Sequence, residues 1–211
     1  MGAGPMNLPR PPLLVISDRS QATRPLVEIA EAAFRAGCRW FSLREKDLSA
    51  AERLELLRAL VALGHRFGAT VTAHEDIDAV VAAEAGGVHL PGGGDPVAAR
   101  RRLPAGLIGV SAHVPEEAAA QLKAGADYVT LSPIFLTASK PGYGPAVGLD
   151  ALAAASRLSP GPVVALGGIG ADNIAACLAA GARGIAVMGE IMRAADPEAT
   201  VRHLLAALDK K

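Results

Sequence analysis

The chain has 211 residues, with 21 basic and 21 acidic side chains, so its formal net charge is zero. A hydrophobic fraction of 51% is large enough for a substantial core and excludes a mainly disordered protein. The balanced charge argues against nucleic acid or an anionic membrane as a partner, because both demand a broad basic face. The apolar stretches are all shorter than the roughly 20 residues that a membrane span needs.

Residues 1–12 contain Pro and Gly but no apolar signal core. We therefore expect a flexible N-terminus over 1–12, a cytoplasmic location, and one folded domain over 13–211. Cys38 and Cys177 form no CxxC pair and have no metal-ligand spacing, so we expect both to be reduced core residues.

The chain repeats one pattern, in which an alanine-rich helical segment ends near a glycine (Gly37, Gly86, Gly125, Gly181) and a short apolar run follows. Glycine supplies the left-handed residue that ends a helix, and continuous apolar runs are typical of parallel strands buried on both faces. Strands are predicted at Leu13–Ser17, Trp40–Leu43, Thr70–Ala73, Gly87–Leu90, Leu107–Ser111, Tyr128–Leu131, Val163–Leu166 and Gly184–Val187. Helices are predicted at Pro25–Ala36, Ala50–Phe67, Ile77–Ala85, Pro96–Arg102, Pro115–Ala124, Leu149–Arg157, Asp172–Ala180 and Pro197–Leu208.

This strict alternation of strands and helices predicts a single (β/α)8 TIM barrel. A doubly wound sheet is the alternative, but such sheets typically have about five or six strands. In a TIM barrel the active site lies at the carboxyl ends of the strands, so polar residues that follow the predicted strands are the candidate functional residues.

Arg44 and Lys46 follow the second predicted strand at alternate positions, so both side chains should point the same way. Together with Thr137, Ser139 and Lys140 in the long segment after the sixth strand, they could bind a phosphate or pyrophosphate. The alternative is that the residues around Arg44 form only a solvated charged turn.

A glycine-rich segment, 167–170, follows the seventh predicted strand and precedes a helix. Glycine lets the backbone approach a phosphate closely, and phosphate sites after the last two strands are frequent in this fold. Gly168 and, after the last strand, Gly189 are therefore candidate phosphate-binding residues. The alternative is a plain tight turn capped by Asp172.

Further candidates could act as bases or metal ligands. His113 lies just past a predicted strand and could be a general base or orient a substrate. His74, Glu75 and Asp76 could hold a divalent cation, with Asp95 as a further oxygen ligand, and hard oxygen ligands favour magnesium. The alternative is that Glu75 and Asp76 merely open the following helix. His89, inside a predicted strand, is more typical of a hydrogen-bonded barrel residue than of a catalyst.

Short motifs along nearly the whole chain, from about Leu13 to Met192, resemble the thiamin phosphate synthase superfamily, which includes the thiazole tautomerases. The motifs are Ser42-Leu43-Arg44-Glu45-Lys46, Gly86-Gly87-Val88-His89-Leu90, Gly109-Val110-Ser111-Ala112-His113, Gly125-Ala126-Asp127-Tyr128-Val129, Ser132-Pro133-Ile134-Phe135-Leu136-Thr137-Ala138-Ser139-Lys140, Ala165-Leu166-Gly167-Gly168-Ile169 and Ile185-Ala186-Val187-Met188.

The resemblance implies an enzyme that joins an aminopyrimidine diphosphate to a thiazole phosphate and releases pyrophosphate, with Mg²⁺ as cofactor. It implies small phosphorylated molecules as partners, and a homodimer is a possible assembly. The implied catalytic residues are His113 and Lys140. The implied substrate-binding residues are Ser42, Arg44, Lys46, His74, Ser111, Thr137, Ser139, Gly168, Met188 and Gly189, and the implied metal ligands are Glu75 and Asp95.

The chain departs from the family pattern at five positions. His74 and Glu75 stand where the family usually has Asn and Asp, and Asp95 is displaced by one residue. Ser42 stands in place of a Gln, and Gly189 in place of a Ser. Three functions therefore compete: a magnesium-dependent synthase, a thiazole tautomerase that uses His113 as base, and a non-catalytic binder of phosphorylated ligands. The complete set of residues in the segment after the sixth strand favours the synthase.

Overall fold

The computed structural model of the chain describes residues 7–137 and 145–209. Its strands are β1 (Leu13–Ile16), β2 (Trp40–Leu43), β3 (Thr70–His74), β4 (Gly87–Leu90), β5 (Leu107–Ala112), β6 (Tyr128–Leu131), β7 (Val163–Leu166) and β8 (Gly184–Val187). Its helices are α1 (Leu26–Arg35), α2 (Ala50–Arg66), α3 (Ile77–Ala82), α4 (Pro96–Arg102), α5 (Pro115–Lys123), α6 (Gly148–Leu158), α7 (Ile174–Ala179), α8 (Gly189–Met192) and α9 (Pro197–Asp209).

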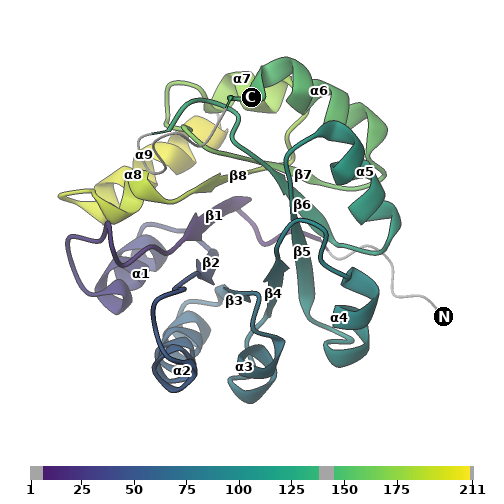
Figure 1. The fold of residues 1–211 in the computed structure, drawn as a ribbon. Coiled ribbons are helices and arrows are strands. Elements are labelled where there is room, and N and C mark those ends of the chain that lie inside the picture. Colours follow the sequence, from purple (N-terminus) through teal and green to yellow (C-terminus); the bar gives the residue numbers. More distant parts are fainter. Residues whose placement is uncertain (1–6, 138–144, 210–211) are drawn as a thin grey trace.

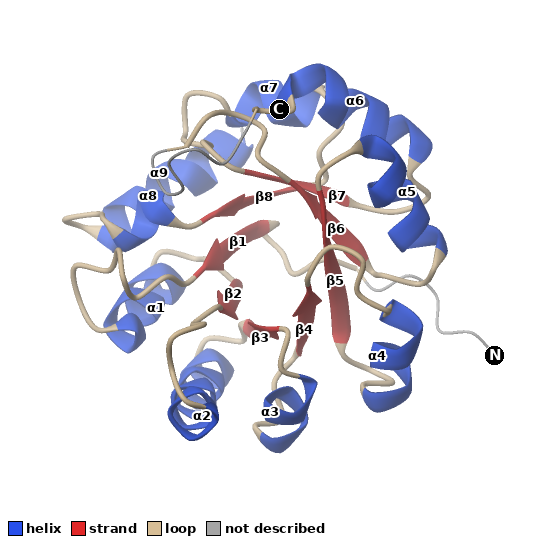
Figure 2. Cartoon of the chain, viewed as in Figure 1, coloured by secondary structure: helices blue, strands red, loops and turns tan. Residues whose placement is uncertain are grey.

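The strands form a closed parallel barrel in the order β1 to β8, and β8 pairs with β1. The helices surround this barrel on the outside (Figures 1 and 2). The predicted (β/α)8 TIM barrel is therefore confirmed. None of the helices in the described parts of the chain is long and apolar enough to cross a membrane.

Most predicted boundaries agree with the structure, with two differences that have a physical cause. Gly37, Gly125 and Gly181 have positive φ angles, as expected for residues that end helices. The third predicted helix is shorter than expected, because Glu84 takes the left-handed conformation (φ 51°) and α3 ends at Ala82. The structure also contains α8, four residues that the sequence analysis assigned to no helix.

Alternate residues of each strand face opposite sides of the barrel wall. On β5, Leu107 packs in the cluster inside the barrel, whereas Ile108 and Val110 pack against the helices. The inner cluster contains Leu8, Leu14, Ile16, Trp40, Leu107, Tyr128, Val164 and Ala186. Residues 1–12 were expected to be flexible. Leu8 belongs to this segment but is only 8% exposed, so the chain around Leu8 packs onto the barrel.

Buried polar side chains also belong to the barrel wall. Ser42, Thr72, His89 and Thr130 are at most 2% exposed. The Thr72 hydroxyl donates a hydrogen bond to Ser42 Oγ over 2.9 Å. The barrel interior thus contains polar groups that are shielded from solvent, next to the strand ends where the functional residues are expected.

Candidate active site

Arg44 and Lys46 follow the end of β2 as the sequence predicts, and the residue between them is anchored to the loop after β1. The carboxylate of Glu45 accepts hydrogen bonds from the Ser17 hydroxyl at 2.6 Å and from the Arg19 backbone N–H at 3.1 Å. Glu45 is only 4% exposed, and burial raises its pKa although the bond from Ser17 opposes this shift. Arg44, Glu45 and Lys46 all line a pocket of about 430 Å³.

The Arg44 guanidinium has no hydrogen bond or ion pair with any residue that the structure describes. Its positive charge nevertheless affects a side chain in the barrel interior. Burial lowers the pKa of His89 to about 3, and the positive charge of Arg44 contributes to the same shift. A partly buried cation that forms no ion pair with a described residue is an arrangement that favours binding of an anion.

Lys46 and Glu75 form an ion pair that the sequence analysis did not predict. Lys46 Nζ lies 2.9 Å from Glu75 Oε1, and the two side chains are 61% and 46% exposed. Glu75 and His74 line the same pocket as Arg44. A pair this exposed contributes little to stability, so an incoming anion or cation could displace either partner.

Two predicted site residues serve the fold in this structure. Asp95 Oδ1 accepts hydrogen bonds from the backbone N–H groups of Val97 and Ala98, at 2.9 and 3.0 Å, and so caps α4. Ser42 is fully buried below the strand end and accepts the hydrogen bond from Thr72. Among the described residues there is no group of three or more His, Cys, Asp or Glu side chains that could hold a metal ion.

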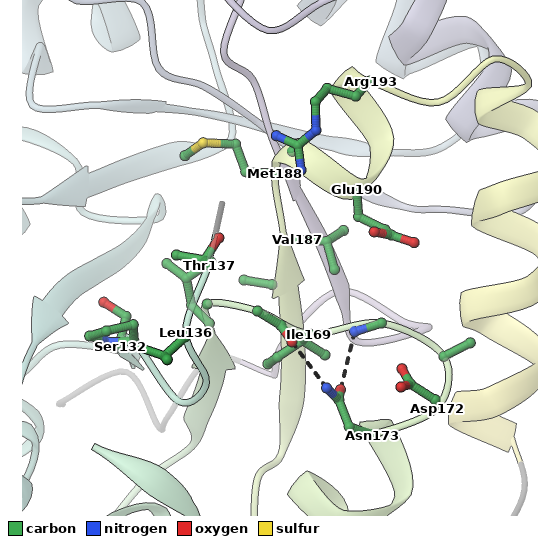
Figure 3. Close-up of a pocket in the computed structure, with 18 of the residues that line it drawn as sticks. Ser132, Leu136, Thr137, Ile169, Asp172, Asn173, Val187, Met188, Glu190 and Arg193 are labelled. Atoms are coloured by element: carbon green, nitrogen blue, oxygen red, sulfur yellow. Dashed lines mark hydrogen bonds between the residues drawn. The ribbon is translucent and has the colours of Figure 1, made fainter. Parts of the chain in front are cut away.

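A second pocket, of about 540 Å³, lies at the ends of β6, β7 and β8 (Figure 3). The predicted residues Thr137, Gly168, Met188 and Gly189 line it. Thr137 was expected beside Arg44 but lines this pocket instead. Ser139 and Lys140, the other members of that expected group, lie outside the residues that the structure describes.

The glycine segment after β7 is built against the loop after β6. Gly168 has a φ of 64°, and a Cβ atom there would lie 2.5 Å from the Leu136 carbonyl oxygen. Asn173 holds the segment from the other side: its Nδ2 donates to the Gly168 carbonyl at 3.0 Å, and its Oδ1 accepts from the Gly170 N–H at 3.1 Å (Figure 3). The sequence analysis did not identify Asn173, although an Asn shortly after a glycine-rich turn is a typical signal for such bonds.

Arg193 is a second lining residue that the sequence analysis missed. It follows α8, and its side chain lies beside Met188 at the pocket (Figure 3). Its Nη1 donates a hydrogen bond to Gln21 Oε1, and Gln21 in turn bonds to Asp18 at the end of β1. No pattern in the sequence indicated Arg193, because it depends on the unpredicted turn of α8.

His113 has one defined tautomer. Its Nδ1 lies 2.8 Å from the Ser132 carbonyl oxygen, which can only accept, so Nδ1 carries the proton. The lone pair is then on Nε2, as a general base requires. Because Ser132 lines the second pocket, His113 is held next to it. Ser111, two residues earlier on β5, is partly exposed and its Oγ lies 3.0 Å from His89 Nε2.

The fold and these two pockets define a class: a (β/α)8 barrel with two pockets at the carboxyl ends of its strands, where the enzymes of this fold have their active sites. Residues 13–191 match the family described as thiamine monophosphate synthase. The chain belongs to this family.

Relatives with this activity in their names cover almost the whole chain. A protein from Geobacter sulfurreducens, provisionally named as a thiamine-phosphate synthase, is 47% identical over 199 residues, which are 93% of each chain. The thiamine-phosphate synthase of a Roseiflexus species is 38% identical over 92% of this chain and 84% of its own. Among solved structures, a thiamine phosphate pyrophosphorylase from Pyrococcus furiosus matches with a TM-score of 0.85 and 31% identity, over 94% of this chain and 95% of its own.

Proposed function

We propose that this chain is a thiamine-phosphate synthase, which couples hydroxymethylpyrimidine diphosphate with thiazole phosphate and releases pyrophosphate. The observation that carries the proposal is the pair of pockets among the strand ends, one with Arg44 and Lys46 and one built on glycine backbone. Two phosphorylated substrates need two such sites. The names of the relatives support the same reaction.

In the proposed reaction, Arg44 and Lys46 bind the diphosphate of the pyrimidine substrate. As the bond between the pyrimidine methylene and the diphosphate breaks, negative charge grows on the departing pyrophosphate, and the two cations stabilise it. Ser139 and Lys140 are proposed to assist, with Lys140 supplying a further positive charge. The pyrimidine lies near Ser111, and the thiazole nitrogen then attacks its methylene carbon.

The thiazole phosphate binds in the second pocket, where the backbone at Gly168 and Gly189 accommodates the phosphate and Met188 contacts the ring. Thr137 and Arg193 supply a hydroxyl and a positive charge at the same pocket. His113, held by the Ser132 carbonyl with its lone pair on Nε2, is proposed to accept a hydrogen bond from the substrate and so orient it for coupling.

The pocket with Arg44 offers few protein ligands for a magnesium ion. Glu75 offers an exposed carboxylate next to Arg44, and Mg²⁺ at phosphate sites commonly takes one or two carboxylates together with phosphate oxygens and waters. Asp95 Oδ1 is committed to α4, so Glu75 is the carboxylate that we propose holds the ion. Bound Mg²⁺ would neutralise charge on the pyrophosphate.

We predict that Mg²⁺ tightens the binding of pyrophosphate and that Glu75→Gln weakens this effect about tenfold, because the metal loses its charged protein ligand. Asp78→Asn is the matched control: Asp78 is 85% exposed and pairs with Arg102 on the barrel surface. Isothermal calorimetry with pyrophosphate, with and without Mg²⁺, measures the effect. An equal loss in both variants contradicts the assignment of Glu75.

The function itself is tested with two reaction mixtures. Purified protein receives the two synthase substrates with Mg²⁺, and separately the thiazole carboxylate phosphate tautomer without metal. The proposal requires thiamin phosphate from the first mixture. Isomerisation in the second mixture alone, lost in His113→Ala, would assign a tautomerase instead, and binding without reaction in either would leave a non-catalytic protein. A cytoplasmic location is part of the proposal, and the homodimer stays a prediction.

A further inference from the structure

A hydrogen-bonded chain of side chains runs through the barrel interior to a residue at the strand ends. The Tyr128 hydroxyl lies 3.0 Å from His89 Nδ1, and His89 Nε2 lies 3.0 Å from Ser111 Oγ. Tyr128 is fully buried and His89 is 2% exposed, whereas Ser111 is partly exposed. The mechanism proposed above uses Ser111 but gives no role to the other two residues.

Neighbouring residues on both sides fix the position of the Tyr128 ring. A Cβ atom on Gly109 would lie 2.1 Å from Tyr128 Cζ, so the ring fills the space that this glycine leaves. On its other side the ring meets Trp40, with ring centroids 4.8 Å apart. The hydroxyl is therefore held at His89 by apolar contacts.

These contacts decide which nitrogen of His89 carries the proton. The Tyr128 hydroxyl has no acceptor other than His89 Nδ1 among the described residues, and a buried donor without an acceptor is unfavourable. If this hydroxyl donates, Nδ1 accepts, and the neutral imidazole carries its proton on Nε2. Burial keeps His89 neutral, since it lowers the pKa to about 3.

The contact between Thr130 and His89 favours the opposite tautomer, but it is weaker than the contact with Tyr128. Thr130 Oγ1 lies 3.3 Å from His89 Nε2, and if it donated there the proton would sit on Nδ1. That contact is longer than the 3.0 Å from Tyr128, and an aliphatic hydroxyl is a weaker donor than the more acidic phenol. With the proton on Nε2, Thr130 and Ser111 are both acceptors.

We infer that Tyr128 and His89 are positioning residues that make Ser111 a hydrogen-bond donor toward the substrate. Ser111 Oγ accepts from His89 Nε2–H, so its own proton can be donated only elsewhere, and it has no other partner among the described residues. In the opposite tautomer Ser111 would donate to His89 and could only accept from a substrate. The inference rests on the proposed function, which places the aminopyrimidine diphosphate here; its ring nitrogens and phosphate oxygens are all acceptors.

The tautomer of His89 can be measured by NMR, without any catalytic reaction. In protein labelled with ¹⁵N-histidine, the long-range ¹H–¹⁵N correlation pattern of the imidazoles distinguishes the two forms. We expect an Nε2–H pattern for His89 and the opposite, Nδ1–H pattern for His113, and His113→Gln identifies the latter signal. An Nδ1–H pattern for His89 overturns the inference.

The consequence for the substrate is tested with Tyr128→Phe, which keeps the ring and removes the donor. We expect kcat/KM for the pyrimidine diphosphate to fall about tenfold, the factor that corresponds to one ordinary hydrogen bond, with KM for the thiazole phosphate unchanged. Ser111→Ala should show the same loss, and the double variant should lose no more than Ser111→Ala alone. Additive losses, or an unchanged kcat/KM in Tyr128→Phe, overturn the inference.

Val164→Ala is the control for packing. Val164 belongs to the same inner cluster as Tyr128 and has no polar atom in its side chain. It should lower the melting temperature without changing kcat/KM for the pyrimidine substrate. If the wild-type protein forms no product, the proposed function fails. The inference is then tested by the calorimetric affinity of the same variants for hydroxymethylpyrimidine diphosphate. Tyr128→Phe and Ser111→Ala should lose affinity equally, and the double variant should lose no more than Ser111→Ala alone.

Discussion

Replacing Arg44 with alanine should weaken the binding of pyrophosphate about 100-fold, because a charge-assisted, bidentate contact to a phosphate is lost. The expectation rests on the guanidinium being partly buried at the end of β2 and bonded to no residue that the structure describes. Removing it therefore breaks no hydrogen bond or ion pair with the described part of the chain. Isothermal calorimetry with pyrophosphate measures the loss, and an unchanged melting temperature shows that the fold is intact.

Arg102→Ala is the matched control for this experiment. Arg102 pairs with Asp78 at 2.7 Å on the barrel surface, and its side chain is 53% exposed. Both variants remove one positive charge, so a general effect of net charge on an anionic ligand would appear in both. Equal weakening in the two variants would contradict a specific role for Arg44.

The barrel could be predicted from the sequence because both faces of every strand are buried. The strands therefore appear as continuous apolar runs, and the segments between them end at residues such as Gly37 and Gly125, whose positive φ angles the structure shows. The boundary at α3 could not be predicted in the same way. There Glu84, which is not a glycine, takes the left-handed conformation, and nothing in the local sequence predicts this.

The places of the candidate residues along the strands were predictable, but their contacts were not. Arg44, Glu75 and Ser111 lie at the ends of β2, β3 and β5, as the fold requires. The ion pair of Glu75 with Lys46 forms between two strands, and Thr137 joins the second pocket through the path of its loop. Such contacts depend on three-dimensional packing, which residue spacing alone does not encode.

Gly168→Ala should lower kcat/KM for the thiazole phosphate about 100-fold, because a displacement of even ~1 Å in a positioning segment has an effect of this size. The new Cβ would lie 2.5 Å from the Leu136 carbonyl oxygen and 2.8 Å from Phe135 Cβ, so the segment after β7 must move. That movement would also disturb the bond from Asn173 to the Gly168 carbonyl.

Gly68→Ala separates this displacement from backbone strain. Gly68 has nearly the same φ, 61° against 64°, but a Cβ atom there would meet no atom within 4 Å. It lies before β3, at the opposite end of the barrel from the pockets. Both variants should lose about 1–2 kcal/mol of unfolding free energy from strain, measured in urea, with a larger loss for Gly168→Ala. Only Gly168→Ala should lose activity toward the thiazole phosphate. Full activity in Gly168→Ala would remove this segment from the binding site, and equal losses in both would show that strain rather than position controls the rate.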